Sequence, residues 1–130
     1  MADFSFQNKT VILMIKVAML GGAERQALGL ADFLMKNYNC KVYLVATHSN
    51  HPTKEFYEFA IACGINKIHY FGEPSLTIQK KFSLLNLKRI FRALKYLNKM
   101  KTEVAKFQPD IIIPFLNTPS KIAALIYKNV

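Results

Sequence analysis

The stretch of sequence that decides the fold is Met19-Leu20-Gly21-Gly22-Ala23-Glu24-Arg25, because of what precedes and follows it. Before it lies an unbroken apolar run over residues 11–15, Val-Ile-Leu-Met-Ile, with the length and β-branched content of a buried parallel strand. After it, from Gln26 on, the sequence has the pattern of an amphipathic helix. A glycine pair between a strand and a helix permits a sharp turn and leaves the first N–H groups of the helix open to an anion or a sugar hydroxyl. The alternative is a tight turn closed by glycine for packing alone.

Alternating strand and helix patterns run along the whole chain. Strands are predicted over Lys9–Ile15, Val42–Thr47, Lys67–Tyr70 and from Asp110 to Ile113 or Phe115. Helices are predicted over Gln26–Asn37, Thr53–Cys63 and Leu84–Phe107, and from Pro119 onward. Strands separated by helices imply right-handed crossovers and a mostly parallel sheet. The predicted fold class is therefore α/β, with a Rossmann-like, doubly wound sheet.

Single residues refine these boundaries. Asn39 is expected to end the first helix in a left-handed conformation, Thr53 to cap the start of the second, and Gly64 to stop it. Gly29 lies inside the first helix, where glycine lowers helix stability, and it predicts a close approach of that helix to the sheet. On the long helix, one stripe of apolar residues is expected to face the sheet: Leu84, Leu87, Phe91 and Leu94.

Two motifs lie at predicted strands, and both resemble motifs of one family. The first is Gly21-Gly22-Ala23-Glu24-Arg25 with the apolar positions Leu28, Leu30, Ala31 and Leu34 after it. The second is Gln108-Pro109-Asp110-Ile111-Ile112-Ile113, followed by Phe115-Leu116-Asn117-Thr118. Together they resemble the N-terminal signature of the GT4 glycosyltransferases, which are retaining enzymes of the two-domain GT-B fold with nucleotide-sugar donors. Between Pro52 and Thr102 the resemblance extends only to the architecture.

The length of the chain limits what the resemblance implies. A chain of 130 residues forms one domain and is too short for two Rossmann-like domains. Residues 1–130 are therefore expected to be part of the N-terminal, acceptor-side domain of a longer glycosyltransferase, without the C-terminal domain that binds the donor. The resemblance implies that the complete enzyme transfers a sugar from a nucleotide-sugar to a glycan or lipid-linked acceptor in cell-surface polysaccharide synthesis. Since the family's paired glutamates lie in the C-terminal domain, this chain alone is expected to hold no catalytic residue and to be inactive.

The resemblance also implies where the ligands bind. It places the phosphate and sugar of the donor beside Gly21 and Gly22, and it gives Glu24 the role of fixing the helix start through the helix dipole and a hydrogen bond. Asn117 and Thr118 follow the last predicted strand at the same edge of the sheet, and their amide and hydroxyl suit sugar hydroxyls. The equal alternative is that one of them is the N-cap of a helix that begins at Pro119.

Two histidines follow the second predicted strand at this edge. His48 is a candidate for an acceptor or sugar contact, and His51 lies in the same loop. Solvated loop histidines are the simpler alternative for both. His69 lies within a short predicted strand and is expected to be structural.

Other nucleotide-binding motifs are absent from the sequence. After Gly21-Gly22 the next glycine is Gly29, so the dinucleotide signature G-x-G-x-x-G is missing, and no G-K-[ST] follows that would make a P-loop. The only cysteines, Cys40 and Cys63, lie far apart and without ligand spacing, which argues against a metal site. The GT4 resemblance likewise implies neither a metal ion nor another cofactor.

Positive charge gathers in the second half of the chain. Residues 1–73 hold seven basic and six acidic side chains, whereas residues 74–130 hold eleven basic and two acidic ones, which accounts for nine of the ten net charges. Four cations form one stripe on the predicted long helix: Lys88, Arg92, Lys95 and Lys99. A solvated basic face is one interpretation. Contact with an anionic membrane is the other, and it makes a non-catalytic docking module the alternative function. Nucleic acid is not an expected partner, since the chain holds no known nucleic-acid-binding motif.

The N-terminus and the cysteines bear on the cellular location. Residues 1–9 lack the basic start and apolar centre of a signal peptide, and no apolar stretch is long enough to span a bilayer. Two distant cysteines suit a reducing compartment. We therefore expect a cytoplasmic protein, located at the inner face of the cytoplasmic membrane if the basic stripe contacts lipid.

Overall fold

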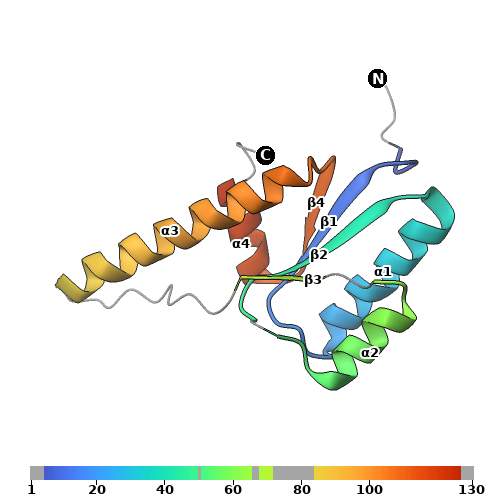
Figure 1. Ribbon diagram of the computed structural model, residues 1–130, viewed down its shortest axis with the longest axis horizontal. Helices are drawn as coiled ribbons and strands as arrows, with labels where there is room; N and C mark the ends of the chain where they lie inside the picture. The colour runs from blue at the N-terminus through green and yellow to red at the C-terminus, as the bar shows by residue number, and fades with distance from the viewer. Residues whose placement is uncertain (1–4, 50, 66–67, 72–83, 127–130) are drawn as a thin grey trace.

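Strands and helices alternate along the chain (Figure 1). The computed structural model describes residues 5–49, 51–65, 68–71 and 84–126, and only the backbone of residues 84–86, 89, 117 and 118. In this part of the chain, the strands are β1 (Thr10–Ile15), β2 (Lys41–Ala46), β3 (Ile68–Tyr70) and β4 (Ile111–Pro114). They form one parallel sheet with the order β3-β2-β1-β4. The helices are α1 (Gly22–Tyr38), α2 (Lys54–Ala62), α3 (Leu84–Lys106) and α4 (Asn117–Ile126).

The helices cover both faces of the sheet, with α1 and α2 on one face and α3 and α4 on the other (Figure 1). One core contains Leu28 of α1 and Phe56 of α2, and the other contains Met100 of α3 and Ile122 of α4. The residues of β1 from Val11 to Ile15 alternate between the two cores, and all are buried. Burial on both faces explains the unbroken apolar run of this strand. The predicted α/β class with a Rossmann-like, doubly wound parallel sheet is confirmed.

The predicted helix ends are confirmed at three residues. Asn39 follows α1 with a φ of 52°, in the left-handed region. The Thr53 hydroxyl accepts a hydrogen bond from the Phe56 N–H at 3.3 Å and so caps the start of α2. Gly64 follows the end of α2 with a φ of 87°, which glycine adopts without strain.

Two helices begin earlier than predicted. α1 begins at Gly22 rather than Gln26, with Gly21 as its N-cap. α4 begins at Asn117, so Pro119 is its third residue rather than its first. Proline is tolerated there because the N–H groups of the first turn have no partner within the helix. The glycine motif is therefore the first turn of α1 and not a loop in front of it.

The apolar stripe of α3 does not face the sheet, so that prediction is wrong. Leu87, Phe91 and Leu94 are exposed, and the side chain of Leu84 lies outside the described residues. Only the C-terminal half of α3 covers the sheet, through residues such as Met100. The reason is length, since 23 helical residues extend about 34 Å and a strand of six residues about 20 Å. The first half of α3 therefore projects beyond the sheet (Figure 1).

The two cysteines are both free thiols. Cys40 is buried, and its thiol donates a hydrogen bond to the Phe6 C=O at 3.0 Å. Burial, and then the nearby Asp32 carboxylate, raise the pKa of the Cys63 thiol, which lowers its reactivity. Among the described helices, none is both long and apolar enough to cross a membrane.

Gly29 is exposed on α1, so the predicted close approach to the sheet at this residue is wrong. A Cβ built on Gly29 meets no atom within 4 Å. Gly29→Ala should therefore raise the free energy of unfolding by about 0.5–1 kcal/mol, because alanine loses less chain entropy than glycine when the helix forms. Thermal unfolding checks this, with a Tm about 2–4 °C above that of the wild type as the expected result. An unchanged or lower Tm would contradict the exposed placement of Gly29.

Candidate functional site

Three loops leave the sheet at the carboxyl ends of β1, β2 and β4, which share one edge because the strands are parallel. Backbone hydrogen bonds join the first residues after β2 and β4 to the last residues of β1. The Thr47 N–H donates to the Ile15 C=O at 2.9 Å, and the Phe115 N–H donates to the Met14 C=O at 2.9 Å. β1 and β4 are neighbours in the sheet, and their helices α1 and α4 cover opposite faces. In doubly wound sheets, ligands bind at such a switch point, so this edge is the candidate site.

The glycine pair forms the start of α1 at this edge. Gly21 is in an extended conformation, with φ −124° and ψ −176°, and its C=O accepts the first helical hydrogen bond from the Arg25 N–H at 3.0 Å. The N–H groups of Gly22 and Ala23 precede that bond and have no partner within the helix. A Cβ on Gly22 meets no atom within 4 Å, and its φ lies outside the left-handed region. This glycine therefore leaves open space at a helix N-terminus rather than relieving backbone strain.

The Glu24 carboxylate folds back over the N-cap. A Cβ on Gly21 would lie 2.7 Å from Glu24 Oε2, so glycine at this position makes room for the carboxylate. Glu24 is only 8% exposed, and within the described part of the chain it forms no hydrogen bond or ion pair. The helix dipole, and not the predicted hydrogen bond, is thus the interaction that favours the carboxylate there. Arg25 turns toward α2 instead, with its guanidinium carbon 6.0 Å from the centre of the Phe59 ring.

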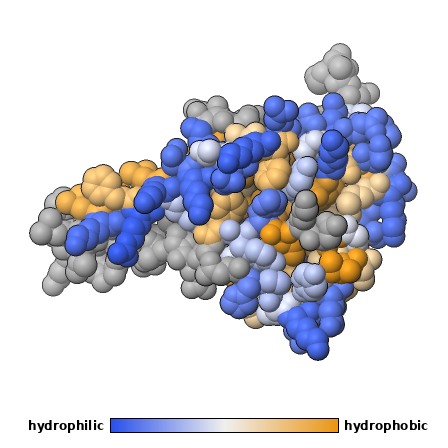
Figure 2. Space-filling view, in the orientation of Figure 1, coloured by the Kyte–Doolittle hydropathy of each residue, from blue (hydrophilic) through white to orange (hydrophobic). Residues whose placement is uncertain are grey.

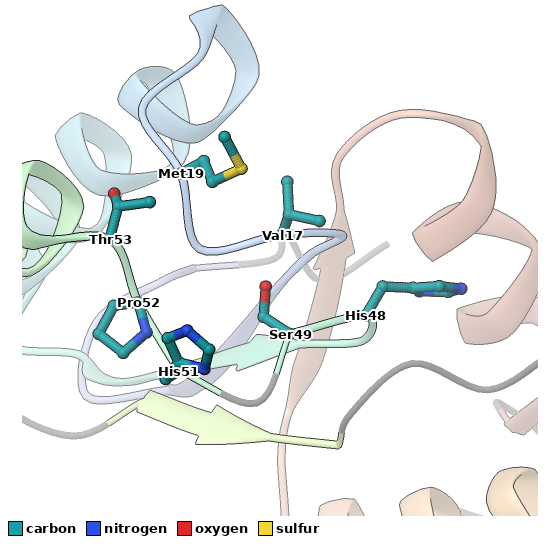
Figure 3. A pocket seen from close by; sticks show the side chains of 7 residues that line it. All are labelled: Val17, Met19, His48, Ser49, His51, Pro52 and Thr53. Carbon is teal, nitrogen blue, oxygen red and sulfur yellow. The ribbon is translucent and has the colours of Figure 1, made fainter.

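A pocket of about 270 Å³ opens between the loops that follow β1 and β2 (Figure 3). Two hydrogen bonds join these loops: the Ala18 N–H donates to Ser49 Oγ at 2.9 Å, and the Thr53 N–H donates to the Ala18 C=O at 2.9 Å. The pocket is lined by Val17 and Met19 from the first loop, and by His48, Ser49, His51, Pro52 and Thr53 from the second. Sequence patterns did not indicate it, because it depends on a hydrogen bond between residues 31 positions apart.

The two loop histidines differ in their surroundings. His48 is half-buried, with Nδ1 2.7 Å from Thr47 Oγ1, and its backbone N–H donates to the Lys16 C=O at 2.7 Å. Its ring points away from the other side chains that line the pocket (Figure 3). His51 is exposed, as expected of a solvated loop residue. The predicted ligand contact of His48 stays a prediction. His69 packs edge-on against the ring of Phe107, the residue after α3, at 4.6 Å between ring centres, in keeping with a structural role.

Tyr96 ties α3 to the candidate site. Its hydroxyl donates a hydrogen bond to the Thr47 C=O, directly after β2. Burial raises the pKa of Tyr96 far above its ordinary value, and the side chain of Thr47 offsets this only in part. The hydroxyl therefore stays protonated, as a donor, at neutral pH. The sequence does not indicate this role, since the partner C=O lies 49 positions away in the chain.

Tyr96→Phe should lower the free energy of unfolding by about 1 kcal/mol at neutral pH, because a part-buried hydrogen bond is lost. An unfolded tyrosine ionises near pH 10, and the folded Tyr96 ionises above that. Its stabilising contribution is therefore complete below about pH 10 and is lost as the pH rises through the folded pKa. Urea unfolding of both proteins at increasing pH should show a constant difference in stability that shrinks above about pH 10. A difference that stays constant there would contradict the role of the hydroxyl.

The remaining predicted site residues lie on α3 and α4. Asn117 and Thr118 are the first two residues of α4, so the N-cap role ahead of Pro119 is wrong, and their side chains lie outside the described residues. Four side chains of α3 are exposed and form no ion pair with any described residue: Lys88, Arg92, Lys95 and Lys99. Within the described ranges, no three His, Cys, Asp or Glu side chains lie close enough together to hold a metal ion.

Comparisons of the chain with protein-family models and with curated proteins give no match. Function is therefore inferred from the carboxyl edge of the sheet and from the motifs that lie there.

Proposed function

We propose that this chain is the acceptor-side, Rossmann-like domain of a retaining, GT4-like glycosyltransferase. The complete enzyme would transfer a sugar from a nucleotide-sugar to a glycan or lipid-linked acceptor in cell-surface polysaccharide synthesis. The observation that carries the proposal is the turn at the start of α1, where Gly21 and Gly22 lie after β1 with open space at Gly22. The order β3-β2-β1-β4 sets this turn beside the switch point of the sheet, where doubly wound sheets bind ligands.

The open helix start suits the leaving group of glycosyl transfer. Negative charge grows on the nucleoside diphosphate when its bond to the sugar breaks. The N–H groups of Gly22 and Ala23, together with the dipole of α1, favour negative charge at this position. A side chain at residue 22 would occupy the space that the donor needs.

Glu24 constrains which part of the donor binds on which side of the turn. Its carboxylate already lies against Gly21 and would repel a diphosphate at that point. A carboxylate does accept hydrogen bonds from sugar hydroxyls. We therefore assign the sugar to the Gly21 side of the turn and the diphosphate to the Gly22 side.

The acceptor is assigned to the loops beside the glycine turn. The pocket of about 270 Å³ lies below the range of about 300–1,000 Å³ that encloses a drug-sized ligand, so it suits one sugar ring rather than a whole nucleotide-sugar. His48, whose ring points away from the other lining side chains, and Asn117 and Thr118 after β4 are the proposed partners of acceptor or sugar hydroxyls beside the pocket. We place the reaction in the cytoplasm, which fits two free cysteines, and we propose no metal ion or other cofactor.

Donor turnover by the protein made from its complete reading frame tests this proposal. The protein is incubated with a panel of UDP- and GDP-sugars and a membrane extract as the source of acceptor, and the released UDP or GDP is measured. At least one donor should be consumed, and its consumption should depend on the extract. A lack of turnover with every donor would contradict the proposal.

The 130-residue chain alone should bind nucleotide-sugars only weakly, with a Kd of roughly 1 mM or above, because the C-terminal domain of the proposed family holds the nucleoside. Isothermal titration calorimetry with UDP- and GDP-sugars checks this, with UDP and GDP themselves as controls. Micromolar binding by these 130 residues would mean that the donor site is not divided between two domains.

A further inference from the structure

The N-terminal half of α3 carries an apolar stripe that the described part of the molecule leaves exposed. Leu87 is 37%, Phe91 69% and Leu94 57% accessible. Their spacings of four and three residues put them on one face of the helix. Figure 2 shows orange side chains along the part of α3 that projects from the body of the domain. A contiguous row of exposed, large apolar side chains marks an interaction surface.

A basic stripe runs directly beside the apolar one. Its members are all exposed: Lys88, Arg92, Lys95 and Lys99. The first three follow Leu87, Phe91 and Leu94 by one position each, so the two stripes are turned by about 100° from each other around the helix. The only acidic residue of α3 is Glu103, near its other end, where it pairs with Lys106 at 3.1 Å. The charge of the basic stripe is therefore not compensated on α3.

The hydrogen bond of Tyr96 shows where this surface lies. Its hydroxyl meets the Thr47 C=O just beyond the carboxyl end of β2, and from there α3 runs back along the sheet toward β4. The residues of α3 before Tyr96 therefore project beyond the carboxyl edge of the sheet. This is the edge that holds the glycine turn and the pocket.

We propose that this face of α3 docks on an anionic membrane surface. A helix that lies in the membrane interface needs an apolar face for the boundary of the acyl chains and cations that reach acidic headgroups. α3 offers both, side by side. A second copy of the chain would bring two basic stripes close together, so charge disfavours a dimer through this face. This docking does not depend on the proposed glycosyl transfer. In a protein that does both, docking orients the candidate site toward a lipid-linked acceptor.

A single tryptophan makes the docking measurable, because the natural chain contains none. Phe91→Trp places an indole in the apolar stripe and leaves the charge unchanged. With vesicles of phosphatidylcholine and phosphatidylglycerol, its emission should shift to the blue and be quenched by brominated acyl chains. With pure phosphatidylcholine vesicles, neither change is expected. Equal insertion into both kinds of vesicle, or insertion into neither, would overturn the proposal.

Matched variants separate the contributions of charge and apolar contact. In vesicle sedimentation, the partition coefficient of Arg92→Glu/Lys95→Glu should fall by at least about tenfold. Lys41→Glu/Lys54→Glu makes the same change of charge at exposed residues of β2 and α2 and should stay within about threefold of the wild type. Phe91→Ser/Leu94→Ser keeps every charge and should also lose binding. Since all these residues are exposed, each Tm should stay close to that of the wild type.

Other occupants of this face predict different results. In one case, light scattering detects a dimer that does not bind vesicles and that Phe91→Ser/Leu94→Ser dissociates. This result would assign the face to a second copy. An acidic protein partner would leave the wild type unbound to vesicles of either composition. An equal loss of binding in Arg92→Glu/Lys95→Glu and Lys41→Glu/Lys54→Glu would mean that membrane binding depends on net charge and not on this face of α3. Each of these three results overturns the proposal.

Discussion

Gly22→Val should reduce turnover of the complete enzyme by about a hundredfold or more and leave the domain folded. The new side chain meets no protein atom within 4 Å of its Cβ, and the backbone at residue 22 lies outside the left-handed region, so valine causes no strain. The isopropyl group would instead fill the space assigned to the donor. Each 1.4 kcal/mol of lost transition-state stabilisation costs about tenfold in rate, so a misplaced donor has a large effect. Turnover and Tm are measured on the same preparation.

Gly29→Val is the matched control for this prediction. Gly29 lies on the same helix, is exposed, and also has no atom within 4 Å of a built Cβ, but it lies two turns away from the carboxyl edge. Its valine variant should keep turnover close to that of the wild type. If Gly22→Val has near-normal turnover, the glycine pair is only a turn, and the assignment of the donor to it fails.

Phe56→Ala should lower the free energy of unfolding by about 3–5 kcal/mol and the Tm by about 10 °C or more. Phe56 of α2 is fully buried in the core between the sheet, α1 and α2, and alanine would leave a cavity there. The adjacent Tyr57 is 51% exposed, so Tyr57→Ala serves as a control with an expected loss below about 1 kcal/mol. Urea and thermal unfolding measure both. Equal losses in the two variants would contradict this packing of α2.

Local sequence patterns were sufficient to predict the architecture. The buried run from Val11 to Ile15 is apolar at every position because both faces of β1 are covered, and this pattern distinguishes a central strand. Asn39 and Thr53 act through hydrogen bonds and backbone angles within their own turn, so their capping roles follow from residue type and position.

The errors arise where structure depends on the size and position of other elements. Helical spacing showed that Phe91 and Leu94 share a face, but it carries no information on how far the sheet reaches beneath α3. Gly29 was interpreted as a packing residue, although it lies on the exposed side of α1. The start of α1 at Gly22 was missed because glycine has low helix propensity, which the position at the first turn makes unimportant.

The candidate site was predicted in part. The edge itself follows from the order of strands and helices, which puts the residues after β1, β2 and β4 together. The pocket and the link from Tyr96 to Thr47 were not predicted, since hydrogen bonds across 31 and 49 residues leave no local pattern. Glu24 was expected to fix the start of α1 through the helix dipole and a hydrogen bond, but the packing of its carboxylate against Gly21 was not predicted.

The measurement that tests the central proposal most directly is the anomeric configuration of the product that the complete protein forms from an α-linked nucleotide-sugar. NMR spectroscopy of the new glycosidic linkage distinguishes the two configurations. A retaining GT4-like enzyme should give an α-linked product with the donor that it consumes. A β-linked product, or the absence of a glycosylated product with every donor tested, would contradict the proposed function.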